Sequence, residues 1–216
     1  TSLTEQRIVR KGLAPVPGYE LGVSQGKVFG IIGNREDGIP PDTLLRVISS
    51  ANYNDNVWHH AVLIRDRVAR KLYLYVDEVQ AAAPVNDNFP YSLANDLPLG
   101  IGRWYGSSMP LYFQGTIDEV RISNRTRFPS SVTSDTVALY HYDEQSGSTV
   151  VDSSPYHNNG LAIGTTIVQG QSGLARTFNA ADNLWQNYDL GIGVAKGGLF
   201  ASYCFNSIGL PIIMAE

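Results

Sequence analysis

The sequence of 216 residues contains one cysteine, Cys204, and so cannot form a disulfide within the chain. Cysteine pairing therefore gives no information on the compartment in which the protein works. The sequence also lacks the run of about 20 consistently apolar residues that a membrane-spanning helix requires. Its most apolar segment follows Lys196, but Ser202, Asn206 and Pro211 interrupt it. We expect a buried or partner-paired β segment there, and no membrane span.

Charge is scarce as well, since charged residues make up 17% of the chain and the net charge is −4. The sixteen Lys and Arg residues are scattered, which excludes a broad basic surface and argues against nucleic acid as a partner. No segment of useful length shows the apolar period of an amphipathic helix. The sequence starts at Thr1 without a visible leader, which we interpret as a processed chain or an excerpt of a longer one.

Glycine and proline are abundant: 21 and 11 residues lie between short apolar segments, a composition typical of all-β proteins. The clearest of these segments are 57–65 and 71–77, which the polar residues 66–70 connect as an antiparallel hairpin. Alternation with period two divides their side chains between two faces. Those predicted on the core face are Val62, Ile64, Leu72, Leu74 and Val76. Those predicted on the opposite face are Leu63, Tyr73 and Tyr75.

Three motifs together are specific for one family. They are VWHHAVLIRDRVARKLYLYVDE at 57–78, LGIGRWYG at 99–106 and YFQGTIDEVRISNRTR at 112–127. With the upstream strands IVRKG and GYELGVSQGKVFG, this set resembles the concanavalin A-like, laminin-G-like jelly-roll domains of secreted and cell-surface proteins, over about residues 8 to 127. The resemblance implies an all-β, two-sheet antiparallel jelly-roll sandwich and an extracellular or cell-surface location.

A second match to the same family is out of order. Residues 137–179, with expected strands at 161–168 and 174–178, look like the family's opening strands, yet they follow the segment matched above. We therefore divide the chain into a jelly-roll portion at 1–133, opening strands at 134–183 and a Gly-rich apolar tail at 184–216. Three explanations fit: an excerpt of a tandem array, one permuted domain, or a last third that completes a neighbouring subunit as an inter-subunit strand.

Catalysis is not expected. Retaining glycoside hydrolases of this fold carry Glu-x-Asp-x-Glu or Glu-x-Asp-x-x-Glu on one strand, and the sequence has neither. Asp77-Glu78 and Asp118-Glu119 are adjacent pairs whose side chains face opposite ways. His59 and His60 are also neighbours on a strand, so they cannot ligate one ion together, and we expect a structural, hydrogen-bonded role for them.

A structural calcium ion is the predicted cofactor, and no other is expected. Asp152, Asn158 and Asn159 lie in one predicted loop, and Asp118 shares its side of a strand with Val120 and Ile122, so its carboxylate is expected to point inward. Such hard oxygen ligands suit calcium, and the resemblance implies an ion because related domains often hold one. The alternative is that Asp118 accepts backbone N–H bonds and that the asparagines serve turns.

Aromatic side chains on loops are the candidate ligand-binding residues, because carbohydrate binding uses exposed aromatic platforms with polar neighbours. The candidates are Trp104, Tyr105, Tyr112, Tyr53 and Tyr91. The alternative is that these side chains belong to the core or to interfaces.

The sequence is therefore consistent with two functions. The first is a non-catalytic extracellular recognition or adhesion module that binds glycans or a cell-surface protein. The second is a structural subunit of an extracellular filament or surface layer, assembled by strand exchange, since a jelly roll without its opening strands leaves long edges to which another chain can add.

Overall fold

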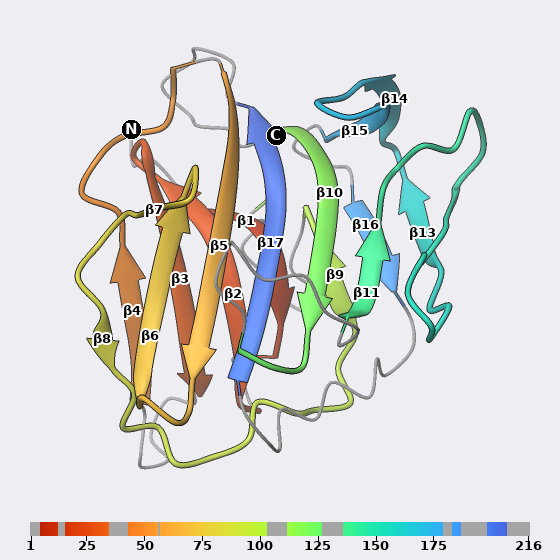
Figure 1. Cartoon of the computed structure of the whole chain (residues 1–216). Coiled ribbons are helices and arrows are strands. Elements are labelled where there is room, and N and C mark those ends of the chain that lie inside the picture. The colour runs from red at the N-terminus through yellow and green to blue at the C-terminus, as the bar shows by residue number, and fades with distance from the viewer. Residues whose placement is uncertain are drawn as a thin grey trace.

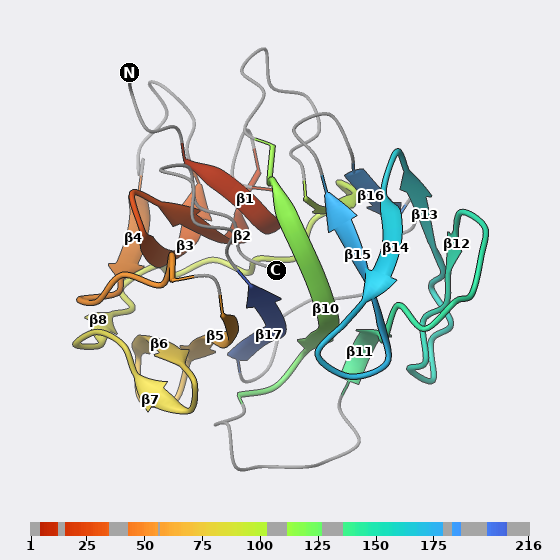
Figure 2. The same ribbon diagram turned by 90° about the horizontal axis from the view of Figure 1, so that it is seen from above.

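The computed structural model describes residues 5–12, 16–34, 43–55, 57–102, 112–126, 136–178, 183–186 and 198–206. These residues form seventeen strands and no helix. The strands build two sheets that pack face to face, and Figure 2 shows the two layers from above. Every strand pair is antiparallel, so the predicted two-sheet antiparallel sandwich is confirmed.

The first sheet has eight strands. Their order is β12 (Thr149–Val150), β13 (Gly160–Ile163), β16 (Asn183–Gln186), β9 (Leu99–Ile101), β1 (Gln6–Lys11), β2 (Gly18–Ser24), β3 (Lys27–Asn34) and β4 (Thr43–Ile48). We call this sheet A. Strand β4 forms one edge of it, and its only described neighbour within the sheet is β3.

The second sheet, sheet B, has nine strands. Its main path is β14 (Thr166–Gln169), β15 (Leu174–Phe178), β10 (Gly115–Ser123), β17 (Gly198–Asn206), β5 (Trp58–Asp66), β6 (Lys71–Val76) and β7 (Val79–Gln80). Two further strands lie off this path, β11 (Thr136–Tyr140) beside β10 and β8 (Val85–Asn86) beside β6.

The last third of the chain joins the same two sheets as the rest. Strand β15 pairs with β10, β16 pairs with β9, and β17 lies between β5 and β10 (Figure 1). The tail therefore contains the predicted β segment, and all three predicted divisions of the chain contribute strands to one sandwich. The division at 133 and 183 stays a prediction.

The predicted strand 161–168 is two strands in different sheets. Strand β13 ends at Ile163 in sheet A, and β14 begins at Thr166 in sheet B. Between them Gly164 has a φ of 79°, in the left-handed region that glycine adopts without a steric penalty. The prediction of one continuous strand was wrong because it passed through this turn.

The predicted hairpin forms as β5 and β6, but the facing of β5 is the reverse of the prediction. Val62 and Ile64 lie opposite Tyr75 and Tyr73, and these four side chains form a cluster outside the core. Leu63 instead belongs to the core. Both sets of alternate positions in β5 are apolar, so alternation does not decide its facing; the pairing register does.

The core lies between the sheets and draws on both. Its members from sheet A include Ile8, Leu21 and Val47, and those from sheet B include Leu74 and Ile117, all nearly or fully buried. Asp118 is also fully buried, as expected. The pairing of β10 with β17 has an irregularity after Asp118, beside Glu119 at a φ of 52°, so the strand is not regular at this point.

Candidate binding pocket

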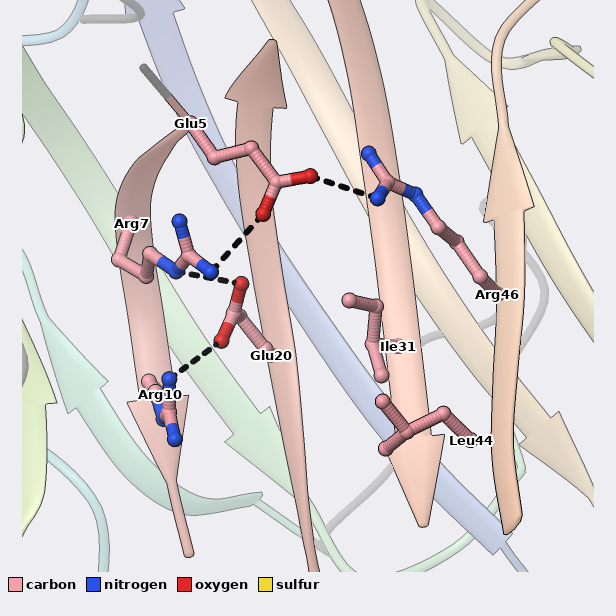
Figure 3. Close-up of a pocket in the computed structure, with 7 residues that line it drawn as sticks. All are labelled: Glu5, Arg7, Arg10, Glu20, Ile31, Leu44 and Arg46. Atoms are coloured by element: carbon pink, nitrogen blue, oxygen red, sulfur yellow. Dashed lines mark hydrogen bonds and ion pairs between the residues drawn. The ribbon is translucent and has the colours of Figure 1, made fainter. Parts of the chain in front are cut away.

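A charged pocket of about 360 Å³ lies on the outer face of sheet A, which is the face turned away from the core. The residues that line it are Glu5, Arg7, Arg10, Glu20, Ile31, Leu44 and Arg46, which Figure 3 shows. Its volume is at the lower end of the range of small-molecule sites, about 300–1,000 Å³. We call it the sheet A pocket.

Strand alternation places most of these side chains. Tyr19 and Leu21 of β2 are core residues, so Glu20 between them projects to the other face. The same rule places Ile31 of β3 beside it, since Ile32 belongs to the core. In β4 the core residues are Leu45 and Val47, which leaves Leu44 and Arg46 outside. Glu20 of β2 pairs with Ile31 of β3, and Ile31 pairs with Arg46 of β4, so these three side chains lie side by side across the sheet.

Strand β1 brings two arginines to the pocket through a bulge. Its pairing with β2 shifts register between Arg7 and Val9, so Arg7 opposes Gly22 and Arg10 opposes Glu20. A bulge inserts one extra residue into a strand and changes which face the following residues occupy. Arg7 and Arg10, three residues apart, thereby line the same pocket.

Ion pairs connect the charged groups of the pocket. Glu20, whose side chain is 1% exposed, contacts Nε of Arg7 at 2.7 Å and Nη1 of Arg10 at 3.1 Å. Glu5 contacts Nη2 of Arg7 at 2.9 Å and Nη1 of Arg46 at 2.6 Å. Figure 3 shows Arg7 between the two carboxylates. Among the described lining residues, three guanidinium groups and two carboxylates sum to a formal charge of +1.

The arginines also fix the protonation state of Glu5. Burial by itself raises the pKa of this carboxyl, but hydrogen bonds from Arg46 and Arg7 and the charges of both arginines outweigh burial and lower the pKa. Glu5 is therefore an ionised acceptor over the whole neutral range. A general acid of a glycosidase needs the opposite shift.

Apolar groups complete the pocket. Ile31 and the half-exposed Leu44 supply its apolar lining, and Ile31 packs with Phe29 in a small cluster on this face. The guanidinium carbon of Arg46 lies 4.5 Å from the centre of the Phe29 ring, and that of Arg7 lies 5.8 Å from it. Such cation–π contacts hold the arginines in place.

None of the pocket residues was predicted as a site residue from the sequence. A signal existed for Glu20, because a charged residue alternates there with Tyr19 and Leu21. No such signal existed for Arg7 and Arg10, because the sequence does not show the bulge that brings them to one face.

Among the aromatic candidates that the structure describes, Tyr53 and Tyr91 do not share one platform. Trp104 and Tyr105 lie outside the described residues, and Tyr112 does not line the sheet A pocket. The ring of Tyr53 packs edge-on against His59, and Tyr91 accepts a hydrogen bond from Arg65, at the other end of β5. Six residues of strand separate these contacts, about 20 Å. A ligand-binding role for the five aromatic residues stays a prediction.

His59 has the structural role that the sequence predicts. Its Nδ1 lies 2.7 Å from Oδ2 of Asp77, and its Nε2 lies 2.8 Å from Oδ1 of Asp55. Asp77 also accepts the backbone N–H of His60. The imidazole thus connects the segment before β5 with the turn after β6.

The structure groups three of the four predicted calcium ligands. Asp152 is fully buried and accepts four hydrogen bonds, from the N–H groups of Leu139, Ser154 and Asn158 and from the Ser154 hydroxyl. The side chain of Asn159 accepts the N–H of Asp152. Asp118 contacts a different segment, because its Oδ2 accepts the N–H of Ser172 at 3.1 Å.

These contacts bear on the two interpretations of Asp118 and Asp152. Within the described ranges, no three His, Cys, Asp or Glu side chains form a group that could hold a metal ion. The hydrogen bonds favour the interpretation in which the carboxylates accept backbone N–H groups. The calcium ion stays a prediction.

Melting the protein with and without a chelator separates these interpretations. If hydrogen bonds alone satisfy Asp118 and Asp152, the melting temperature should not change on chelation. A fall in melting temperature that added calcium reverses would instead establish the ion, since a ligand of the native state must raise its stability.

The buried carboxyl group of Asp118 should make the stability of the fold depend on pH. Burial raises the pKa of its carboxyl from 3.8 to about 6, against the hydrogen bond from the Ser172 N–H. The folded state therefore binds this proton more tightly than the unfolded state, and the stability gained from it is lost as the pH rises from about 4 to about 6.

Asp118→Asn should remove this dependence. Relative to the parent, the variant should gain about 3 kcal/mol of unfolding free energy between about pH 4 and about pH 7, read from urea melts across that range. The exposed Asp96→Asn is the matched control and should follow the parent. Parallel curves for the parent and Asp118→Asn would contradict the prediction.

The described strands form an antiparallel β-sandwich with a charged pocket on the outer face of sheet A. The family model described as "Concanavalin A-like lectin/glucanases superfamily" matches residues 2–133, and the chain belongs to this family. Comparisons with curated proteins and with solved structures give no match. No helix in the described part of the chain has the length and apolar character to cross a membrane. Membership of the family supports carbohydrate or partner binding in general.

Proposed function

We propose that the chain is a non-catalytic extracellular recognition module that binds glycans in the sheet A pocket. The observation that carries the proposal is the mixture of groups there. Arginine N–H groups can donate to sugar oxygens, and the carboxylate of Glu5, which is 29% exposed, can accept from sugar hydroxyls. The apolar C–H face of a sugar ring fits against Ile31 and Leu44.

The carboxylates of the pocket support binding rather than bond cleavage. Arginines lower the pKa of Glu5, and two arginines contact Glu20. A glycosidase needs one carboxyl that keeps its proton near neutral pH. An activity screen with glycan substrates should therefore show no turnover.

A glycan array followed by calorimetry tests the proposal, with two variants of the same strand. Leu44→Asp places a charge in the apolar lining of the pocket. Ile48→Asp is the matched control, because Ile48 is also on β4, is similarly exposed (41% against 37%) and does not line the pocket. We expect Leu44→Asp to weaken binding by about tenfold or more, and Ile48→Asp to bind as the parent. Binding to no glycan, or equal loss in both variants, would refute the proposal.

One observation favours a second function, a subunit that assembles by strand exchange. Strand β17 lies outside the region that the family model matches, yet it pairs with β5 and β10, which lie inside that region. A strand at the end of the chain that fills the middle of a sheet could also come from a neighbouring copy. Native sizing at several concentrations tests this: exchange should give dimers and larger species that increase with concentration, and a monomer throughout would exclude it.

A further inference from the structure

Arg7 has one donor group that the described residues do not use. Its Nε contacts Glu20 and its Nη2 contacts Glu5, whereas its Nη1 is buried and has no hydrogen-bond partner among the described residues. Figure 3 shows this third nitrogen without a contact to the other residues of the pocket. A buried donor without an acceptor is costly, the more so when it is charged, so native structures seldom keep one without a reason.

The charge of the pocket indicates which acceptor is missing. The described residues of the pocket carry a formal charge of +1, and Glu5 and Glu20 are already paired with arginines. One further carboxylate, supplied by a ligand, would balance the charge of these described residues and accept a hydrogen bond from Nη1 of Arg7. Hydrogen bonds between guanidinium and carboxylate groups are roughly twice as strong as neutral ones.

We infer that the sheet A pocket takes an acidic saccharide of the uronic acid class, whose carboxylate accepts a hydrogen bond from Nη1 of Arg7. The inference rests on the proposed glycan binding and names the ligand class. The hydroxyls of the same sugar donate to Glu5, and its apolar face lies against Ile31 and Leu44. A simple carboxylate such as acetate would leave these last contacts unmade.

The test compares ligands that differ only in the carboxyl group. Oligomers of galacturonic acid and glucuronic acid are titrated into the intact chain beside their methyl esters and beside galactose and glucose oligomers. We expect at least one acidic oligomer to bind about tenfold or more tightly than its ester and its neutral counterpart. The ester removes the charge without changing the protein, so a folding defect cannot imitate the result.

A protein variant locates the contact. Arg7→Lys keeps the positive charge but removes the guanidinium fork, so the preference for the acid over the ester should fall to about twofold or less. Arg67→Lys, at a partly exposed arginine outside the pocket, is the control and should keep the full preference. If Arg7→Lys does not fold, the comparison of acid and ester with the parent chain still decides whether the pocket prefers a carboxylate.

The outcomes separate the inference from the proposed function. Equal binding of acid, ester and neutral oligomer overturns the inference and leaves glycan binding standing. Tighter binding of a sulfated neutral oligomer than of any uronate overturns the inference that the ligand anion is a carboxylate, and indicates a sulfate in its place. Binding of none of these ligands, together with a silent glycan array, overturns both.

Discussion

A chain that ends at residue 197 should show no cooperative thermal unfolding. The truncation removes β17, which pairs with β5 along all nine of its residues and with β10 on its other side. Without it, two central strands become edges, and the core under them is exposed to water. The far-ultraviolet circular dichroism of the truncated chain should lack the parent's transition, or the chain should aggregate.

A second truncation controls for the rest of the tail. A chain that ends at residue 206 keeps β17 and should melt as the parent does. A synthetic peptide of residues 198–206 should restore the transition to the shorter chain, and a peptide of the same composition in scrambled order should not. If the chain ending at 197 melts like the parent, β17 is not an integral strand of sheet B.

The peptide experiment also bears on assembly. A strand that can be supplied in trans by a peptide can be supplied in trans by another copy of the chain. Rescue by the peptide would therefore make strand exchange chemically feasible, while native sizing decides whether the full chain uses it.

Much of the fold could be predicted from the sequence because it depends on local patterns. The hairpin of β5 and β6 follows from two alternating apolar segments and a short polar connection, and it forms as predicted. The antiparallel sandwich follows from many short strands between glycines and prolines, and from the family motifs. These features need no knowledge of which strand neighbours which.

The errors arise where a local pattern is ambiguous. In β5, Val62 and Ile64 are as apolar as Leu63, so alternation alone does not show which of them face the core. The register decides, because it places Ile64 opposite Tyr73. Between β13 and β14, Gly164 interrupts a segment that has strand composition on both sides. Composition alone does not show that the chain changes sheets at this glycine.

The pocket could not be predicted because it depends on strand order and on a bulge. Glu20 and Arg10 are ten residues apart and meet because β1 pairs with β2, whereas Glu5 reaches Arg46 across β2 and β3. The register shift after Arg7 then turns a second arginine to the same face. The sequence indicates loop aromatics as candidates because loops carry function on many scaffolds, but the sheet A pocket lies on a sheet face.

Asp87→Ala should destabilise the chain by about 3–5 kcal/mol, because it leaves a buried arginine without its counter-ion. Arg65 is fully buried; its Nε contacts Asp87 at 2.6 Å and its Nη2 contacts the same carboxylate at 3.3 Å. The carbonyl of Phe89 accepts a hydrogen bond from its Nη2, the carbonyl of Tyr91 accepts one from its Nη1, and Asp87 itself accepts the N–H of Phe89. The substitution therefore breaks both the ion pair and the segment folded around it.

Urea unfolding at neutral pH measures the effect, and Arg67→Ala is the control. Arg67 also donates to the carbonyl of Tyr91, at 3.1 Å, but this hydrogen bond is exposed to solvent, so its loss should cost no more than about 1 kcal/mol. Replacing both partners, as in Arg65→Met with Asp87→Ala, should recover part of the loss because no unpaired charge remains buried. A cost for Asp87→Ala as small as that of the control would show that water reaches Arg65, and that the ion pair does not hold the segment after β8 against sheet B.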